Sequence, residues 1–338
     1  TNSKITVTHQ TDAQLTGGYI NGNKQASTLI NNCKVDVKGN NSAAIGIQVS
    51  KCNINNVDIT SYSTSGAKSE VKGIYSASGE SHILKNVTIN AKVEYNPSVN
   101  NVYSTTGIEA KDGTFDIYNC NIKIEGYTKP YASTGIAIKE NAIVNMHSGT
   151  IKVNDNMMSD VDCANSGIHV YGDLNIDESN GKVFIKGGNT AISVNGINSN
   201  VNINGGTYCS PNHGGIYNLK SKTINIKNAF LYNSKTLGED KDTTCIAYGG
   251  MYSSGPGIIT VSNSRILGGN HGIRVKNESG AANITINNSY IEGQNDVLSL
   301  AAGTFTVGKN VVIKSKTEKL IEDNLQGTLV DPNGVFSK

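Results

Sequence analysis

The sequence predicts an all-β chain, a parallel β-helix of about 10–11 coils in which each coil holds three short strands. Two repeated phrases carry this prediction. The first centres on an aliphatic residue that glycine precedes in most copies, and it recurs at intervals of 24 to 34 residues. The second is an alternating apolar phrase with asparagine near its middle. Alternation with a period of two is the strand period, so neither phrase predicts a helix.

The first phrase, GIxV, occurs for example as SGIHV at 166–170 and HGIRV at 271–275. Its aliphatic residue and the residue two positions later are predicted to point inward, which directs the residue between them outward. One unit cannot bury its own apolar face, whereas stacked units share a core. The predicted inward column is Ile47, Ile74, Ile108, Ile136, Ile168, Ile192, Ile216, Ile246, Ile273 and Leu298.

The second phrase predicts two strands on either side of a sharp bend at asparagine, as in NINNVDI at 53–59. Such a bend needs left-handed backbone geometry, which Asn and Gly adopt at low cost. Stacked asparagine amides can also hydrogen-bond from one coil to the next. Ser148 and Gly205 take this position in two other copies. The predicted column is Asn32, Asn56, Asn86, Asn119, Asn228, Asn263 and Asn288.

The ends of a stacked core need caps, because open coils would expose apolar side chains and unpaired strand edges. We therefore expect an irregular N-terminal coil or cap at 1–27, the β-helix at 28–313, and a C-terminal cap at 314–338. Within the last segment, the stretch 314–327 is helix-like, because it places three aliphatic residues at helical spacing: Leu320, Ile321 and Leu325.

Composition excludes several classes of protein. The formal net charge is +2 and the lysines are scattered, so nucleic acid is not an expected partner. No apolar run approaches 18 residues, so no membrane span is predicted. The six cysteines form no C-x-x-C pair, which argues against zinc, although Cys209 and Cys245 could form a disulfide. The chain begins without a signal-like segment, which fits a mature secreted or cell-surface protein whose signal and anchor lie outside this chain.

The isoleucine and asparagine columns together resemble those of the right-handed parallel β-helices of the pectate-lyase-like superfamily, over roughly residues 28–313. The resemblance implies right-handed coiling and a site on the GIxV face, where enzymes of this superfamily usually bind acidic polysaccharides. Asn270–Gly272 and Arg274–Lys276 are similar to two polygalacturonase motifs. They share one coil here, and the Asp-Asp pair of that family is missing, so the resemblance does not extend to its catalysis.

Candidate contacts lie at outward positions of the GIxV face. Tyrosine rings pack on apolar sugar faces, and charged groups recognise carboxylates. The candidates are Tyr75, Glu109, Lys139, His169, Tyr171, Tyr217, Arg274 and Lys276. Ala247 is the outward residue that follows Ile246. No cofactor is expected apart from possible Ca²⁺ binding by loop carboxylates, the candidates being Asp160, Asp162, Asp240 and Asp242.

Glu109 is the one carboxylate predicted on this face, whereas glycosidases need two carboxylates about 5–9.5 Å apart. The sequence therefore favours a non-catalytic module, an adhesin, structural protein or glycan-binding protein whose partner is a polysaccharide or a host or cell-surface glycan. The alternative is a polysaccharide lyase or glycoside hydrolase that acts on an acidic glycan along the GIxV face. A weaker alternative is a receptor-binding protein similar to phage tailspikes.

Overall fold

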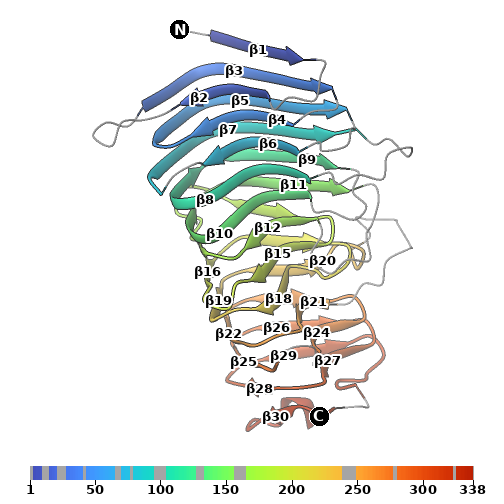
Figure 1. The fold of residues 1–338 in the computed structure, drawn as a ribbon. Coiled ribbons are helices and arrows are strands. Elements are labelled where there is room, and N and C mark those ends of the chain that lie inside the picture. Colours follow the sequence, from blue (N-terminus) through green and yellow to red (C-terminus); the bar gives the residue numbers. More distant parts are fainter. Residues whose placement is uncertain are drawn as a thin grey trace.

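The structure is a computed structural model, and it describes residues 3–9, 15–20, 28–40, 43–64, 70–76, 79–94, 104–126, 133–155, 165–237, 249–276, 280–322 and 325–337. These residues form a right-handed parallel β-helix, in which the coils follow one another along a single rod and the two termini lie at opposite ends (Figure 1). All strand pairings of the described residues are parallel, and each strand pairs with its counterpart in the next coil. The predicted fold class is confirmed.

Each coil has three strand positions. The first position holds β2 (Leu15–Ile20), β4 (Ala44–Val49), β6 (Glu70–Ser76), β12 (Ser166–Val170), β15 (Thr190–Asn195), β18 (Ile216–Lys220), β21 (Gly249–Ser253), β24 (His271–Val275) and β27 (Asp296–Leu300). The second holds β13 (Asp173–Ile176), β16 (Asn200–Asn204), β19 (Thr223–Lys227), β22 (Gly257–Ser262), β25 (Ala282–Asn287), β28 (Thr304–Val307) and β30 (Thr328–Val330).

The third position holds β1 (Ser3–His9), β9 (Cys120–Gly126), β11 (Gly149–Asp155), β14 (Val183–Lys186), β17 (Thr207–Ser210), β20 (Phe230–Asn233), β23 (Arg265–Leu267), β26 (Tyr290–Gly293) and β29 (Val312–Ser315). Some strands of the N-terminal half run through two positions. Those that join the second and third positions are β3 (Thr28–Asn40), β5 (Cys52–Thr64) and β7 (Ser81–Val93). Those that join the first and second are β8 (Ser104–Tyr118) and β10 (Ser133–Met146).

The core is a continuous stack of aliphatic side chains inside the rod. At the first position, Ile47, Ile74, Ile108, Ile136 and Ile168 pair in register from coil to coil and are almost fully buried. Burying each such side chain stabilises the fold by roughly 1.5–3 kcal/mol before entropy is counted. His82 also points inward, and its ring centre lies 4.5 Å from that of Phe115.

Glycine precedes the inward aliphatic residue because the core leaves no room for a side chain there. A Cβ atom on Gly135 would lie 2.2 Å from Ile151 Cγ2 and 2.4 Å from the carbonyl oxygen of Gly167. The same two kinds of atom, a third-strand aliphatic methyl and a backbone carbonyl of the next coil, crowd the equivalent positions Gly46, Gly73, Gly107, Gly167 and Gly272. Glycine therefore lets the first and third strands approach closely at these positions.

The asparagine column is confirmed in geometry and in contacts. All seven predicted asparagines have φ between 45° and 55°, and Gly205 has φ 100°. The Nδ2 atom of Asn56 donates to Asn32 Oδ1 over 3.0 Å, and Asn86 and Asn119 each donate to the preceding asparagine over 2.9 Å. The copy with Ser148 differs, because its left-handed residue is Gly149, at φ 137°.

One member of the predicted isoleucine column is wrong. Met251 of β21 pairs with Ile216 of β18 and with Ile273 of β24, so Met251 occupies the position assigned to Ile246. Consequently the outward residue of this coil is Tyr252, which stands in the place predicted for Ala247. Residues 238–248, which include the predicted phrase, lie outside the described residues. Coil-to-coil pairing decides this register, because two nearby phrases compete for one place in the ladder.

The helix-like reading of 314–327 is also wrong for its described residues, which continue the ladder instead. Ile321 forms a parallel bridge with Leu298, and the carbonyl oxygen of Leu320 accepts hydrogen bonds from the amides of Val297 and Leu298 at 3.1 Å. The exposed edge of β27 needs backbone partners, and this demand outweighs the helical spacing. None of the described residues forms a helix with the length and apolar character that crossing a membrane requires.

Candidate functional site

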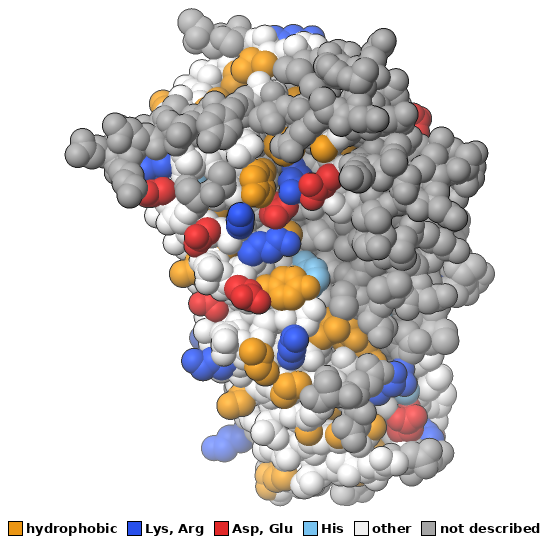
Figure 2. All heavy atoms as spheres, in the orientation of Figure 1, with side chains coloured by type: hydrophobic (Ala, Val, Ile, Leu, Met, Phe, Trp, Pro, Cys, Tyr) orange, Lys and Arg blue, Asp and Glu red, His pale blue; other side chains and the backbone are white. Residues whose placement is uncertain are grey.

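Four predicted residues, Tyr75, Glu109, Lys139 and Tyr171, line one groove beside the outward row of the first strands. Tyr75, Glu109, Ala137 and His169 pair in register as a row along the rod. We call the adjoining hollow the first-strand groove; its volume is about 580 Å³ and it is lined by Tyr75, Glu109, Lys111, Lys139, Glu140, Asn141 and Tyr171. Figure 2 shows basic, acidic and apolar side chains close together in the middle of the visible face.

Two lysines hold the Glu109 carboxylate at the centre of the first-strand groove. Lys72 Nζ lies 2.7 Å from Glu109 Oε2, and Lys139 Nζ lies 4.0 Å from Glu109 Oε1. Lys72 also pairs with Glu70 at 2.9 Å and lies 4.6 Å from the centre of the Tyr75 ring. Burial alone would lower the pKa of Lys72, but hydrogen bonds and charge attraction from both carboxylates raise it.

Tyr171 lines the first-strand groove and packs against His169, which lies beside the groove. The ring centres of His169 and Tyr171 are 4.7 Å apart, and Asn195 Nδ2 donates to Tyr171 Oη over 3.3 Å. Burial, with a smaller contribution from the positive charge of Lys139, lowers the pKa of His169 to about 4. His169 is therefore neutral at physiological pH and adds no positive charge beside the groove.

The first-strand groove is lined by two carboxylates, Glu109 and Glu140. General acid–base cleavage of a glycosidic bond needs two carboxylates with room for a sugar between them. Glu109 has both oxygens directed at ammonium groups, and its side chain is only 15% exposed. Lys111 and Lys139 are exposed at the rim, and no ion pair of Lys111 is seen within the described part of the chain. The groove thus combines two tyrosine rings with basic and acidic groups.

The remaining predicted residues lie further along the rod. His169 and Arg274 are four coils apart in the same row, about 19 Å. The guanidinium of Arg274 lies 5.7 Å from the centre of the Tyr252 ring, and Lys276, just after β24, is exposed. The structure therefore does not bring Arg274 and Lys276 into the first-strand groove.

Tyr217 does not offer the accessible surface that its outward position predicts. Its side chain is fully buried, its ring centre lies 4.7 Å from those of His213 and Tyr252, and its hydroxyl lies 3.0 Å from Ser254 Oγ. Burial, together with the positive charges of Arg274 and Lys276, lowers the pKa of His213 to about 3. The three rings form a packed cluster on the outer face of two successive coils.

His271, which the sequence places beside Arg274, forms a pair with a carboxylate. Its Nδ1 atom lies 2.8 Å from Asp296 Oδ1, and Asp296 is buried. The two residues face each other across β24 and β27. This pairing gives His271 a structural partner in the next coil, in keeping with its assignment to a rung of the repeat.

The predicted calcium ligands Asp160, Asp162, Asp240 and Asp242 lie outside the described residues, as does Cys245 of the suggested disulfide. Cys209 is buried in strand β17. Within the described ranges, no group of three or more His, Cys, Asp or Glu side chains is arranged to hold a metal ion.

Lys72, which contacts Glu109 and Tyr75 of the groove, was not among the residues predicted from the sequence. A strict alternation gives Lys72 the same inward direction as Ile74. The Cβ position of Gly73 faces Ile89 inside the rod, so two successive residues, Gly73 and Ile74, point inward and the alternation breaks. One sequence signal could have revealed this role of Lys72. It is a lysine two positions before the inward isoleucine and next to a glycine that must face the core.

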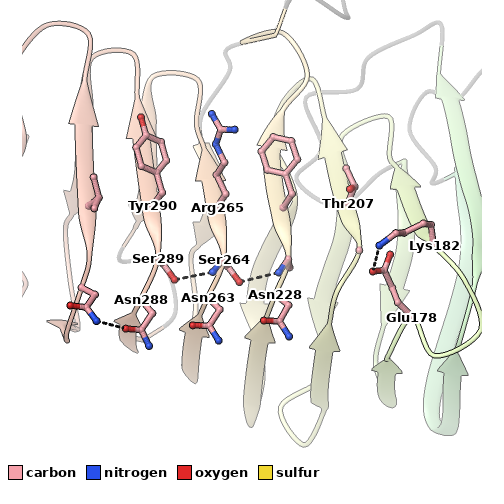
Figure 3. A pocket seen from close by; sticks show the side chains of 15 residues that line it. Glu178, Lys182, Thr207, Asn228, Asn263, Ser264, Arg265, Asn288, Ser289 and Tyr290 are labelled. Atoms are coloured by element: carbon pink, nitrogen blue, oxygen red, sulfur yellow. Dashed lines mark hydrogen bonds and ion pairs between the residues drawn. The ribbon is translucent and has the colours of Figure 1, made fainter.

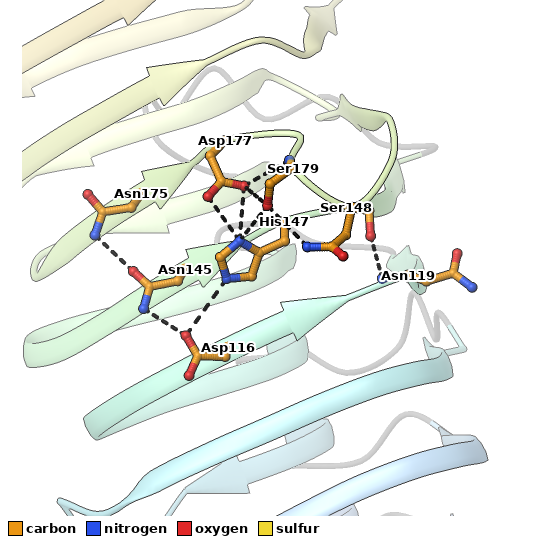
Figure 4. Close-up of polar contacts among 9 residues, drawn as sticks. Asp116, Asn119, Asn145, His147, Ser148, Asn175, Asp177 and Ser179 are labelled. Atoms are coloured by element: carbon orange, nitrogen blue, oxygen red, sulfur yellow. Dashed lines mark hydrogen bonds and ion pairs between the residues drawn. The ribbon is translucent and has the colours of Figure 1, made fainter.

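A second polar cluster was also missed, at the bend after β10 (Figure 4). His147 Nδ1 lies 2.9 Å from Asp177 Oδ1, and its Nε2 atom lies 3.9 Å from Asp116 Oδ1. Ser179 Oγ donates to Asp177 Oδ1 over 2.8 Å. Asp116 also accepts from Asn145 and so begins a ladder of amide contacts that continues through Asn175, Asn202 and Asn225. These contacts cross-link successive coils.

Comparison with protein-family models and with curated proteins returned no match to this chain.

Proposed function

We propose that this protein is a non-catalytic module that binds an acidic polysaccharide along the first-strand groove. The observation that carries the proposal is the grouping of Tyr75, Tyr171, Lys111 and Lys139 around one hollow on the flank of the rod. Aromatic rings stack on the apolar faces of sugars, while lysines neutralise carboxylates. The pairing of Glu109 with Lys72 and Lys139 argues against a role as proton donor.

We also propose that the chain belongs to the pectate-lyase-like superfamily of β-helices and acts outside the cell, as a secreted or cell-surface protein. The support for the superfamily is the left-handed asparagine column between the second and third strands, together with the GIxV first strand. The extracellular role follows from the proposed ligand, because a long acidic polysaccharide is a polymer found outside the cell. In this setting the rod presents its groove parallel to its long axis.

The binding test compares polygalacturonate, which is acidic, with a neutral galactan of similar length. The double variant Lys111→Gln/Lys139→Gln should bind polygalacturonate roughly tenfold or more weakly, because two charge-assisted contacts are lost. The matched control is Lys85→Gln/Lys227→Gln, which removes the same charge from exposed lysines on second strands. This control should bind as the unaltered chain does.

Equal losses in the two double variants would show that only net charge matters, and the proposed groove would be rejected. Preference for the neutral galactan would also contradict it. Release of reducing or unsaturated ends from either polymer, abolished by Glu109→Gln, would instead favour a glycoside hydrolase or polysaccharide lyase.

A further inference from the structure

A row of side chains on the outer face of the third strands lies apart from the first-strand groove. It crosses β14, β17, β20, β23 and β26, and its members pair in register from coil to coil. In order along the rod, this third-strand row is Phe184, Thr207, Phe230, Arg265 and Tyr290. Aromatic rings thus stand on alternate coils, about 10 Å apart. This separation is comparable to the length of a disaccharide unit.

Arg265 stands between two of these rings. Its guanidinium carbon lies 5.5 Å from the centre of the Phe230 ring and 5.4 Å from that of Tyr290. Figure 3 shows Arg265 and Tyr290 projecting to the same side of neighbouring strands. The rings hold the guanidinium in place by cation–π contacts, which leave its N–H groups available as hydrogen-bond donors.

The anionic side chains around the third-strand row already have partners. Glu292 accepts a hydrogen bond from the Tyr290 hydroxyl over 2.7 Å. Glu178 accepts from the amide of Val183 over 2.8 Å and lies 3.4 Å from Lys182. No ion pair of Arg265 occurs among the residues that the structure describes, although the side chain is exposed. A positive group with a free hydrogen-bonding fork therefore faces solvent between two aromatic rings.

Asparagine amides border the row on one side. The row and the amides together line a shallow groove of about 740 Å³. Along this edge Asn228 donates to Asn204 over 2.7 Å and Asn310 donates to Asn288 over 3.0 Å. The side chain of Asn263, which lies between them and two residues before Arg265, makes no hydrogen bond to another described side chain. The amide ladder is interrupted beside the arginine, which leaves donor and acceptor groups for a ligand.

We propose that the third-strand row is a second glycan site, which binds an acidic saccharide lying along the rod. Alternate sugar rings stack on Phe230 and Tyr290, and the carboxylate of the sugar between them accepts hydrogen bonds from Arg265. The amide of Asn263 contacts the hydroxyl groups of that sugar. The chemistry at this row favours an acidic glycan over a second copy of the chain, because a large self-associating surface would bury more apolar area than three separated rings provide.

The test is calorimetric titration of the full chain with oligogalacturonate and with a neutral galacto-oligosaccharide of equal length. Arg265→Gln should weaken acidic-oligosaccharide binding at the row roughly tenfold or more. The affinity of Arg265→Lys should lie between those of the unaltered chain and Arg265→Gln, because lysine keeps the charge but loses the planar fork. Lys227→Gln is the control for net charge, and thermal unfolding of each variant checks that the exposed substitution leaves the fold intact.

The two proposed sites can be separated in one series. The Lys111→Gln/Lys139→Gln variant should still bind the acidic oligosaccharide, and adding Arg265→Gln should abolish that binding. This result would establish the third-strand site whether or not the first-strand groove binds. If adding Arg265→Gln to that double variant leaves its affinity for the acidic oligosaccharide unchanged, the third-strand site alone is overturned. Sedimentation of the same samples tests the other occupant: an oligomer that dissociates in Arg265→Gln would assign the row to self-association and reject the glycan site.

Discussion

The ammonium group of Lys72 lies 2.7 Å from the Glu109 carboxylate, in the adjoining coil, and 2.9 Å from the Glu70 carboxylate in its own strand. The lysine side chain is only 10% exposed. Removing one partner from such an enclosed ion pair leaves the other charge without compensation. The pair therefore ties β6 to β8 beside the first-strand groove.

We expect Lys72→Met to lower the free energy of unfolding by about 2–4 kcal/mol, because Glu109 then keeps only Lys139, at 4.0 Å. Urea unfolding at neutral pH measures this change. The double variant Lys72→Met/Glu109→Gln should recover much of the loss, since no buried charge is left unpaired. A double variant as unstable as the single one would show that lost packing, not lost pairing, causes the effect.

Gly135→Ala should destabilise the fold by roughly 1–3 kcal/mol or more, because the added methyl group overlaps Ile151 and the backbone of Gly167. Thermal unfolding provides the measurement. Ala137→Ser changes a half-buried outward residue of the same strand and serves as the control, with little expected effect. Tolerance of Gly135→Ala would mean that the first and third strands are not so closely packed.

Asn119 has φ 50° and donates to Asn86 over 2.9 Å. Asn119→Ala should cost about 2–3 kcal/mol, the sum of left-handed strain at a Cβ-bearing residue and one lost hydrogen bond. Asn119→Gly relieves the strain and should cost about 1 kcal/mol. Chemical denaturation of the two variants separates these contributions, and equal losses would contradict the role of backbone geometry.

The lowered pKa of His213 predicts that the folded protein loses stability as the pH falls. Burial, aided by the charges of Arg274 and Lys276, lowers its pKa to about 3, whereas an unfolded histidine titrates near 6.5. As pH falls below about 6.5 the unfolded state binds the proton first, so stability falls until the folded-state pKa is reached. By pH 5 this group should remove about 2 kcal/mol from the free energy of unfolding relative to pH 7.5.

His213→Phe keeps an aromatic ring between Tyr217 and Tyr252 but cannot bind a proton. Its stability, followed by denaturation between pH 5 and pH 7.5, should therefore vary less with pH than that of the unaltered chain, by about 2 kcal/mol. An unchanged pH dependence of stability would show that a group other than His213 is responsible. His169, whose pKa is lowered to about 4, adds a slope of the same sign in both proteins.

Much of the fold could be predicted because the repeat makes the same demand in every coil. Inward residues such as Ile108 and Ile136 need only be aliphatic, and Asn56 and Asn86 need only accept left-handed geometry. These requirements act on single residues and their near neighbours. Stacking then repeats them, so periodicity alone locates the three strands of most coils.

The candidate site was predictable only in part. Tyr75, Glu109, Lys139 and Tyr171 share the first-strand groove, as expected for outward residues of one face. Whether an outward residue is accessible, however, depends on what packs over it. The burial of Tyr217 beneath His213 and Tyr252 follows from the register of β21, which sequence phase had assigned to a different phrase.

The sequence by itself determined the coil, through the alternation of apolar residues and the positions of glycine and asparagine. Tertiary structure decided which side chains meet across coils, such as Lys72 with Glu109 and Arg265 with Phe230 and Tyr290. The physical reason is that neighbours along the rod are about 5 Å apart in space but more than twenty residues apart in the chain. Insertions of unequal length between coils hide those contacts until every register is known.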